Sequence, residues 1–247
     1  MLFSCGSDES LSDSDIKQND STSTNVANNG EAQIITPEVD QEIKEYENNG
    51  IKLTEIKAEQ SEATLTLNTK TFLEGVNKLN FQVDGVKDYK VAYLSNNYYL
   101  SQFESNVFEM EFLYGNNVFL AFLIDKNGIA IKSNKGSVLQ NAVVGDMENM
   151  FDMNGPHLFY YLPQTTTEQA ILDFYLVNTT IGKGNSVKVT INNTEFIIDK
   201  WAAYKISGAL NPENTIRIQL INEKGVLIEG PFNDSGERSF SLISSAS

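Results

Sequence analysis

The sequence predicts an all-β protein, and three observations support this prediction. After residue 50, short apolar–polar alternations recur with turn signals about every 8–12 residues. Residues 113–131 and 210–228 match one another without a gap, which indicates two copies of one structural unit. A polar, acidic segment precedes both copies. Together these features predict a disordered N-terminal tether followed by two tandem β-sandwich domains of immunoglobulin-like type.

The N-terminal residues resemble a bacterial lipobox. In Leu2-Phe3-Ser4-Cys5, a leucine stands three positions before the cysteine and a small residue directly before it. The resemblance implies that Cys5 becomes the first mature residue and receives two or three lipid chains, enough for firm membrane anchoring. A signal peptide also has basic and apolar regions, and only Leu2 and Phe3 precede the Ser4-Cys5 pair, so we expect the natural start codon further upstream. The alternative is a lone cysteine near a ragged terminus.

Residues 6–49 are predicted to be the disordered tether. They hold eleven Asp and Glu residues against two Lys, with no aromatic residue before Tyr46. Such a segment cannot bury enough apolar area to offset the loss of chain entropy. Residues 6–10 resemble the acidic export signal of Bacteroidota lipoproteins on the outer face of the outer membrane, although disordered tethers are often acidic. We therefore expect an outer-membrane lipoprotein that is exposed at the cell surface or, alternatively, faces the periplasm.

The net charge of the whole chain is −15. Such a charge argues against a nucleic-acid partner, because the phosphate backbone repels an acidic surface. Cys5 is the only cysteine, so an intrachain disulfide is excluded.

The internal repeat defines the domains. In each copy, three alternate apolar residues share one face of a strand, and a polar turn that ends in glycine follows. Upstream, residues 90–97 correspond to residues 188–193 with a small length difference. The boundary is predicted between Ala142 and Leu162. The predicted segments are a lipobox remnant at 1–5, the tether at 6–49, the first sandwich at 50–150 and the second sandwich at 151–244. The identical pairs of the repeat are Leu113/Leu210, Asn117/Asn214, Leu123/Leu220, Ile124/Ile221, Gly128/Gly225 and Ile131/Ile228.

The second copy resembles a known family. Residues 172–178, 201–204, 213–216 and 230–233, together with residues 156–160, are similar to a family of Bacteroidota lipoproteins with tandem immunoglobulin-like domains. Some members carry the loose label phosphopeptide-binding, and the resemblance implies no particular activity. It extends from about residue 150 to residue 242. Members tend to have a His-Ile-His-Leu strand where this chain has residues 91–94, Val-Ala-Tyr-Leu, so a role of those histidines is not expected here.

The residues available for catalysis are few, and we expect no enzyme. His157 is the only histidine, and one Cys with one His cannot form a zinc site. Neither a glycine-rich phosphate loop nor a G-x-S-x-G turn is present. Asp125 and Asn127 could offer oxygen ligands to calcium, but a plain hairpin turn is the expected alternative. No catalytic residue, metal or cofactor is predicted.

Asp173 is the one acidic residue inside an apolar strand, residues 171–176. By alternation we expect it to face solvent. The alternative is a pair with a buried Lys or Arg, and Arg217 and Arg238 are the natural partners to test.

Six aromatic residues are candidates for contact with a ligand or partner. Stacking of sugars on them is one hypothesis, and core or interdomain packing is its alternative. The lead hypothesis is a non-enzymatic, lipid-anchored binding or scaffold module, acting as an accessory subunit of an outer-membrane protein complex. The alternative is a cell-surface glycan-binding module. The candidate residues are Tyr98, Tyr99, Tyr160, Tyr161, Trp201 and Tyr204.

Overall fold

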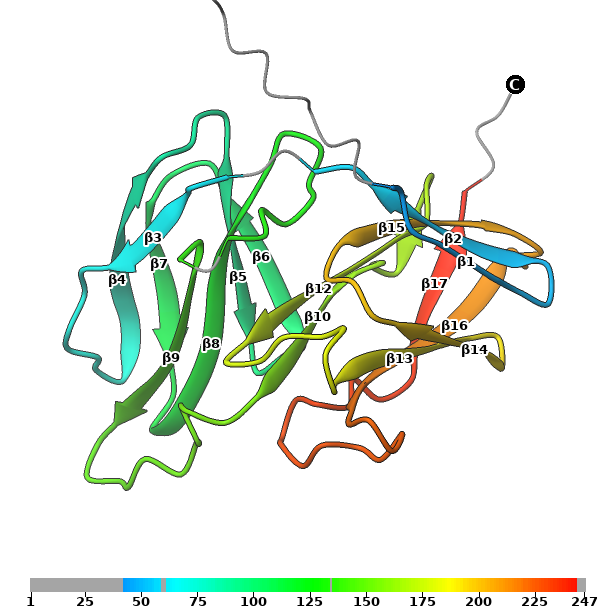
Figure 1. The fold of residues 1–247 in the computed structure, drawn as a ribbon. Helices are drawn as coiled ribbons and strands as arrows, with labels where there is room; N and C mark the ends of the chain where they lie inside the picture. Colours follow the sequence, from blue (N-terminus) through cyan, green and yellow to red (C-terminus); the bar gives the residue numbers. More distant parts are fainter. Residues whose placement is uncertain (1–41, 59–60, 134, 244–247) are drawn as a thin grey trace, which may run out of the picture. The chain divides into compact units, whose positions relative to one another are not determined.

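The structure is a computed structural model that describes residues 42–58, 61–133 and 135–243. Within these ranges every regular element is a β-strand, and the strands form four sheets (Figure 1). The predicted all-β class, with two β-sandwiches of immunoglobulin-like type, is therefore confirmed. The described ranges hold no helix long and apolar enough to cross a membrane. Cys5 and tether residues 6–41 lie outside the described residues.

The first sandwich consists of two antiparallel sheets. One has the order β3-β4-β7 and the other the order β6-β5-β8-β9. The strands are β3 (Thr64–Leu67), β4 (Gly75–Asp84), β5 (Lys90–Ser95), β6 (Tyr99–Phe103), β7 (Val107–Phe112), β8 (Gly115–Ile124) and β9 (Ser137–Val144).

The second sandwich also has two sheets, with the orders β1-β2-β15-β12-β10 and β11-β17-β16-β13-β14. Its strands are β1 (Glu45–Asn48), β2 (Ile51–Ile56), β10 (His157–Leu162), β11 (Thr166–Thr167), β12 (Ile171–Val177), β13 (Ser186–Ile191), β14 (Thr194–Ile198), β15 (Ala203–Gly208), β16 (Glu213–Ile221) and β17 (Arg238–Leu242).

The β1–β2 hairpin corrects the predicted domain boundaries at residues 49 and 50. Strand β2 pairs with β15 over six residues, from Ile51 opposite Gly208 to Ile56 opposite Ala203. The hairpin therefore belongs to the second sandwich, and the first sandwich is inserted between β2 and β10. Its two-residue loop is Asn49-Gly50, with φ of 47° and 75°. Both residues have the positive φ that a type I′ turn requires, and Asn-Gly is the dipeptide that favours this turn.

The repeat is present in detail in the structure. The side-chain oxygen of Asp125 accepts hydrogen bonds from the backbone amides two and four residues ahead, at 2.8 and 2.9 Å. Asn222 makes the same two bonds at 2.9 and 3.1 Å. Gly128 and Gly225 follow with φ of 77° and 74°. Asp125 thus acts as a turn residue, as the hairpin interpretation predicts.

The upstream part of the repeat is shifted relative to the sequence match. Val91 pairs with Leu123, and Val187 pairs with Leu220, so these two valines occupy equivalent positions. The sequence match aligned Lys90 with Lys188, which is two residues further along. Because side chains alternate with a period of two, this shift leaves each residue on its predicted face.

Three separate cores hold the described chain together. One fills the second sandwich and one fills the first. The third lies where the β5–β8 region of the first sandwich meets the β10–β12 region of the second, and it includes Leu120, Phe122, Tyr161 and Tyr175. Strands β8, β10 and β12 are consequently buried on both faces. The connection from Val144 to His157 falls inside the predicted boundary window.

Candidate functional site

The structure buries three of the six candidate aromatic residues. Tyr160, Tyr161 and Tyr204 are 3%, 0% and 0% exposed. Tyr160 lies in the core of the second sandwich and Tyr161 in the interdomain core, so the two side chains point to opposite faces of the strand. Trp201 is half-buried, and its Nε1 donates to the carbonyl of Phe174 at 3.1 Å. The three buried tyrosines serve packing, and the prediction that they contact a ligand is corrected, whereas Trp201 also lines an open groove.

Tyr98 and Tyr99 remain exposed, at 61% and 70%. Their ring centroids are 5.0 Å apart and the ring planes meet at 72°. The guanidinium of Arg238 lies 4.6 Å from the Tyr98 ring centroid, a cation–π contact. Rings at this angle form a corner, not the coplanar platform on which sugars stack.

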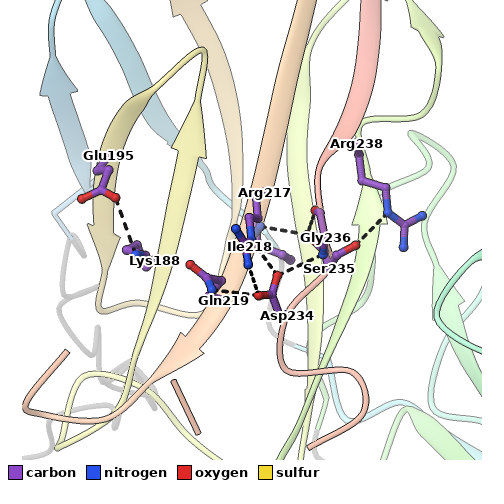
Figure 2. Close-up of polar contacts among 9 residues, drawn as sticks. All are labelled: Lys188, Glu195, Arg217, Ile218, Gln219, Asp234, Ser235, Gly236 and Arg238. Atoms are coloured by element: carbon purple, nitrogen blue, oxygen red, sulfur yellow. Dashed lines mark hydrogen bonds and ion pairs between the residues drawn. The ribbon is translucent and has the colours of Figure 1, made fainter. Parts of the chain in front are cut away.

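The outer face of strands β13, β14 and β16 carries a network of polar contacts (Figure 2). Arg217 binds the carboxylate of Asp234 with both Nε and Nη2, the former at 2.8 Å. Gln219 donates to the same carboxylate at 2.9 Å. These hydrogen bonds lower the pKa of Asp234 and raise that of Arg217. Because Asp234 occupies the guanidinium fork, Arg217 is not free to bind a phosphate in this arrangement.

The repeat relates this polar face to an apolar face of the first copy. Arg217 and Gln219 are equivalent to Leu120 and Phe122 of the first copy. In the first copy this face packs into the interdomain core, whereas in the second copy its equivalent carries the polar network of Figure 2.

Asp173 does not face solvent. The predicted alternative, a pair with a buried lysine or arginine, is confirmed, although the partner is neither Arg217 nor Arg238. Alternation does place it opposite its apolar neighbours, but that face meets the first sandwich, and Asp173 is 0% exposed. Its partner is Lys132 of the first sandwich, which reaches Asp173 Oδ1. Oδ2 accepts a hydrogen bond from the backbone amide of Ala130 at 2.8 Å. Burial raises the pKa of Asp173 and lowers that of Lys132, and their mutual attraction opposes both changes.

His157 has a structural environment at the start of β10. It is 1% exposed, its ring stacks on Phe151 at 4.7 Å, and its Nε2 lies 2.7 Å from the carbonyl oxygen of Asp152. Burial lowers the pKa of this histidine. The described ranges contain no group of three or more His, Cys, Asp or Glu residues placed to hold a metal ion.

One end of the first sandwich carries a set of exposed apolar side chains, which we call the apolar end. Their exposed fractions run from 45% for Met147 to 81% for Met150. Isolated exposed apolar residues are ordinary, but a contiguous group marks an interaction site. The members are Leu73, Val76, Leu113, Tyr114, Met147 and Met150.

Strand pairing brings the three segments of the apolar end together. Gly75 at the start of β4 pairs with Phe112 at the end of β7. Gly115 at the start of β8 pairs with Val144 at the end of β9, at the lower end of the first sandwich in Figure 1. The side chain of Asn116 fixes the third segment, because its Oδ1 accepts from the amide of Met150 at 3.2 Å.

The segments that form the apolar end also carry exposed acidic residues. Segments 73–76, 111–116 and 144–150 contain four carboxylates and neither Lys nor Arg. Sequence reasoning missed this site because all of its apolar residues except Val76 lie between strands. The available signal was that large apolar residues, Leu113-Tyr114 and Met147/Met150, stand between strands. The carboxylates are Glu74, Glu111, Asp146 and Glu148.

Comparisons with known proteins concern architecture alone. No protein-family model matches the chain, and no curated protein matches it. The fibronectin(III)-like modules of Clostridium thermocellum CbhA are 12% identical over 72% of this chain and 93% of that chain, with a TM-score of 0.25. The central fibronectin-III array of RIM-binding protein is 10% identical over 76% and 88%, with a TM-score of 0.28. The two tandem V-type regions of a v-region-containing chitin binding protein are 8% identical over 73% and 98%, with a TM-score of 0.23.

Proposed function

We propose that this protein is a non-enzymatic binding module that docks a partner protein through the apolar end. The single observation that carries the proposal is the group of six exposed apolar side chains on three adjoining segments. Leu113 and Met150, at 67% and 81% exposed, would lose most of their contact with water in a complex.

The chemistry of the apolar end indicates what kind of partner surface would bind it. Four carboxylates around an apolar centre match a protein surface with an apolar centre and a rim of Lys and Arg. Opposite charges at the rim would increase the association rate and exclude acidic surfaces, while the apolar centre would supply most of the affinity.

The rest of the molecule supports a scaffold role. The interdomain core joins the two sandwiches through large buried side chains. The first sandwich, which carries the apolar end, is therefore packed against the second sandwich and not only linked to it by chain. We further propose that lipidated Cys5 and the tether anchor this unit to the outer membrane, where it acts as an accessory subunit of a protein complex. The lipobox resemblance and the acidic segment support this placement.

The glycan alternative has weaker support. It requires coplanar exposed rings, and only Tyr98 and Tyr99 are exposed among the six candidates, at a 72° angle. The variant in which alanine replaces both Tyr98 and Tyr99 therefore serves as a second control beside the apolar-end variant in the docking test.

The docking proposal predicts that the full-length double variant Leu113→Ser/Met150→Ser loses its partner. With both apolar contacts removed, we expect at least a tenfold reduction in the partner co-isolated from native-host membranes, because about 1.4 kcal/mol already changes binding tenfold. Ile197→Ser is the matched control, since Ile197 is 49% exposed but lies on β14 of the second sandwich. Equal co-isolation from the double variant and the control would overturn the proposal.

The anchor proposal predicts that Cys5→Ser releases the protein from membranes. The natural gene with its own upstream sequence is expressed in the native host, and an alkyne-labelled fatty acid reports lipidation. The unsubstituted protein should take up the label and partition into detergent, because two or three acyl chains anchor firmly. The Cys5→Ser protein should do neither. Membrane retention of an unlabelled Cys5→Ser protein would contradict lipid anchoring and leave the docking proposal to its own test.

A further inference from the structure

The buried pair of Lys132 and Asp173 is the strongest chemical feature that the proposed function does not use. Lys132 follows the turn after β8 in the first sandwich, and Asp173 lies in β12 of the second. The side chain of Asp173 is 0% exposed and that of Lys132 is 12% exposed. A buried ion pair contributes little net stability, because both charges lose their hydration. A contribution to stability therefore does not explain why these two charged groups are buried together.

From this geometry we infer that Lys132 and Asp173 form an intramolecular isopeptide bond that fastens the two sandwiches together. The amine and the carboxyl are in direct contact and belong to residues that are 41 apart in the chain. Holding two reacting groups in contact replaces a bimolecular encounter with a unimolecular step, which is a large kinetic advantage.

The reaction balances without an oxidant or another reactant. A bond forms between Lys132 Nζ and Asp173 Cγ, and the bond between Cγ and Oδ1 breaks. Oδ1 leaves as water, and the ammonium group of Lys132 supplies both protons of that water. The first proton moves from the ammonium to the carboxylate, which leaves a neutral amine to attack a neutral carboxyl. Burial favours this neutral pair, since it lowers the pKa of Lys132 and raises the pKa of Asp173.

Two backbone groups are placed to assist the reaction and to satisfy its product. The amide of Ala130 donates to Asp173 Oδ2 at 2.8 Å, where negative charge would develop on the tetrahedral intermediate. The same bond would hold the carbonyl oxygen of the product. The carbonyl of Phe174 lies 3.0 Å from Lys132 Nζ and would accept the N–H of the new amide. The product would thus be a neutral, fully hydrogen-bonded buried amide in place of two buried charges.

Aromatic side chains form the walls of the site and limit its contact with water. The rings of Tyr175 and Trp201 each lie with their centroids 5.8 Å from Lys132 Nζ. Both residues also line an open groove of about 650 Å³ together with Ser133 and Ser137. The groove therefore lies directly beyond the aromatic rings that flank Lys132.

The test is the intact mass of the full 247-residue chain, purified in its folded form. The bond predicts a mass that is one water molecule below the sequence mass and, after trypsin digestion, a branched peptide that joins Lys132 to Asp173. Lys132→Met and Asp173→Ala should each restore the mass of their own sequence. For Asp173→Asn, the bond predicts a mass that is one ammonia molecule below the mass of its own sequence, because attack on the carboxamide releases ammonia instead of water.

Two results would overturn the proposal. One is a folded protein, with a cooperative thermal transition, whose mass equals the sequence mass. The other is a loss of water that persists in Lys132→Met, because that loss would belong to a succinimide elsewhere in the chain. Both results leave the docking proposal untouched, since the apolar end contains neither residue.

Discussion

A fragment of residues 151–247, which contains the whole second domain predicted from the sequence (151–244), is expected to show no cooperative unfolding transition. The fragment lacks β2, so β15 would become an exposed edge strand and its six-residue pairing with β2 would be lost. It would also lack Ile51 and Leu53, which are 3% and 0% exposed in the core of the second sandwich. Truncation of one such side chain to alanine already costs about 2–5 kcal/mol. Loss of both approaches the whole stability of a domain, about 5–15 kcal/mol.

The matched control restores the hairpin. Residues 42–57 are joined to residues 151–247 by a flexible Gly/Ser linker, and far-UV circular dichroism is followed during heating. We expect this fused fragment to unfold in one cooperative transition. If residues 151–247 alone unfolded cooperatively at the same temperature as the fused fragment, the assignment of β1 and β2 to the second sandwich would be wrong.

Phe122→Ala is expected to be the most damaging single substitution between the two sandwiches. Phe122 is 0% exposed, and its ring lies 5.0 Å from that of Tyr161 and 5.1 Å from that of Tyr175, measured between centroids. Removal of a buried phenylalanine side chain costs about 3–5 kcal/mol, because the lost contacts leave a cavity. The free energy of unfolding from urea titration measures this loss.

The repeat provides the control for Phe122→Ala. Gln219 occupies the equivalent position of the second copy, on the polar face shown in Figure 2. Gln219→Ala should change the free energy of unfolding by less than about 1 kcal/mol. Fluorescence of Trp201, the only tryptophan, reports on the second sandwich, and circular dichroism reports on both. The two signals should coincide in the unsubstituted protein and in both variants, so that each titration gives one free energy of unfolding. Equal effects of the two substitutions would contradict the interdomain core.

The sequence predicts much of this fold because its local patterns follow simple physical rules. The match of residues 113–131 to residues 210–228 correctly predicts two sandwiches, and the turns at Asp125 and Asn222 form as expected. The hairpin at Asn49-Gly50 was missed, although this dipeptide is itself a strong turn signal. Its acidic neighbours resemble a tether, and only the pairing of β2 with β15 makes the hairpin part of a core.

The position of Asp173 shows what a single sequence leaves open. Alternation correctly places it opposite its apolar neighbours, but it does not say whether that face meets water or another domain. The continuous apolar run from Phe119 to Ile124 was a usable sign, because strands buried on both faces lose the alternation of polar and apolar residues. Lys132 could not be identified as the partner, since it belongs to an irregular segment of the other sandwich.

The candidate site was the least predictable part. The apolar end depends on three turns that are distant in sequence, and strand pairing alone brings Val144 close to Gly115 and Phe112 close to Gly75. The aromatic candidates were chosen by residue type alone. The structure places Tyr160 and Tyr204 in the core of the second sandwich and Tyr161 in the interdomain core.

Site-specific photocrosslinking in the native host tests the docking proposal most directly. A photoreactive amino acid replaces Met150 at the apolar end or, as a control, the exposed Glu195 of the polar face in Figure 2. The proposal predicts one discrete crosslinked protein from position 150, with an apolar and basic contact surface, and no such product from position 195. Absence of a product at position 150, or the same products from both positions, would contradict it.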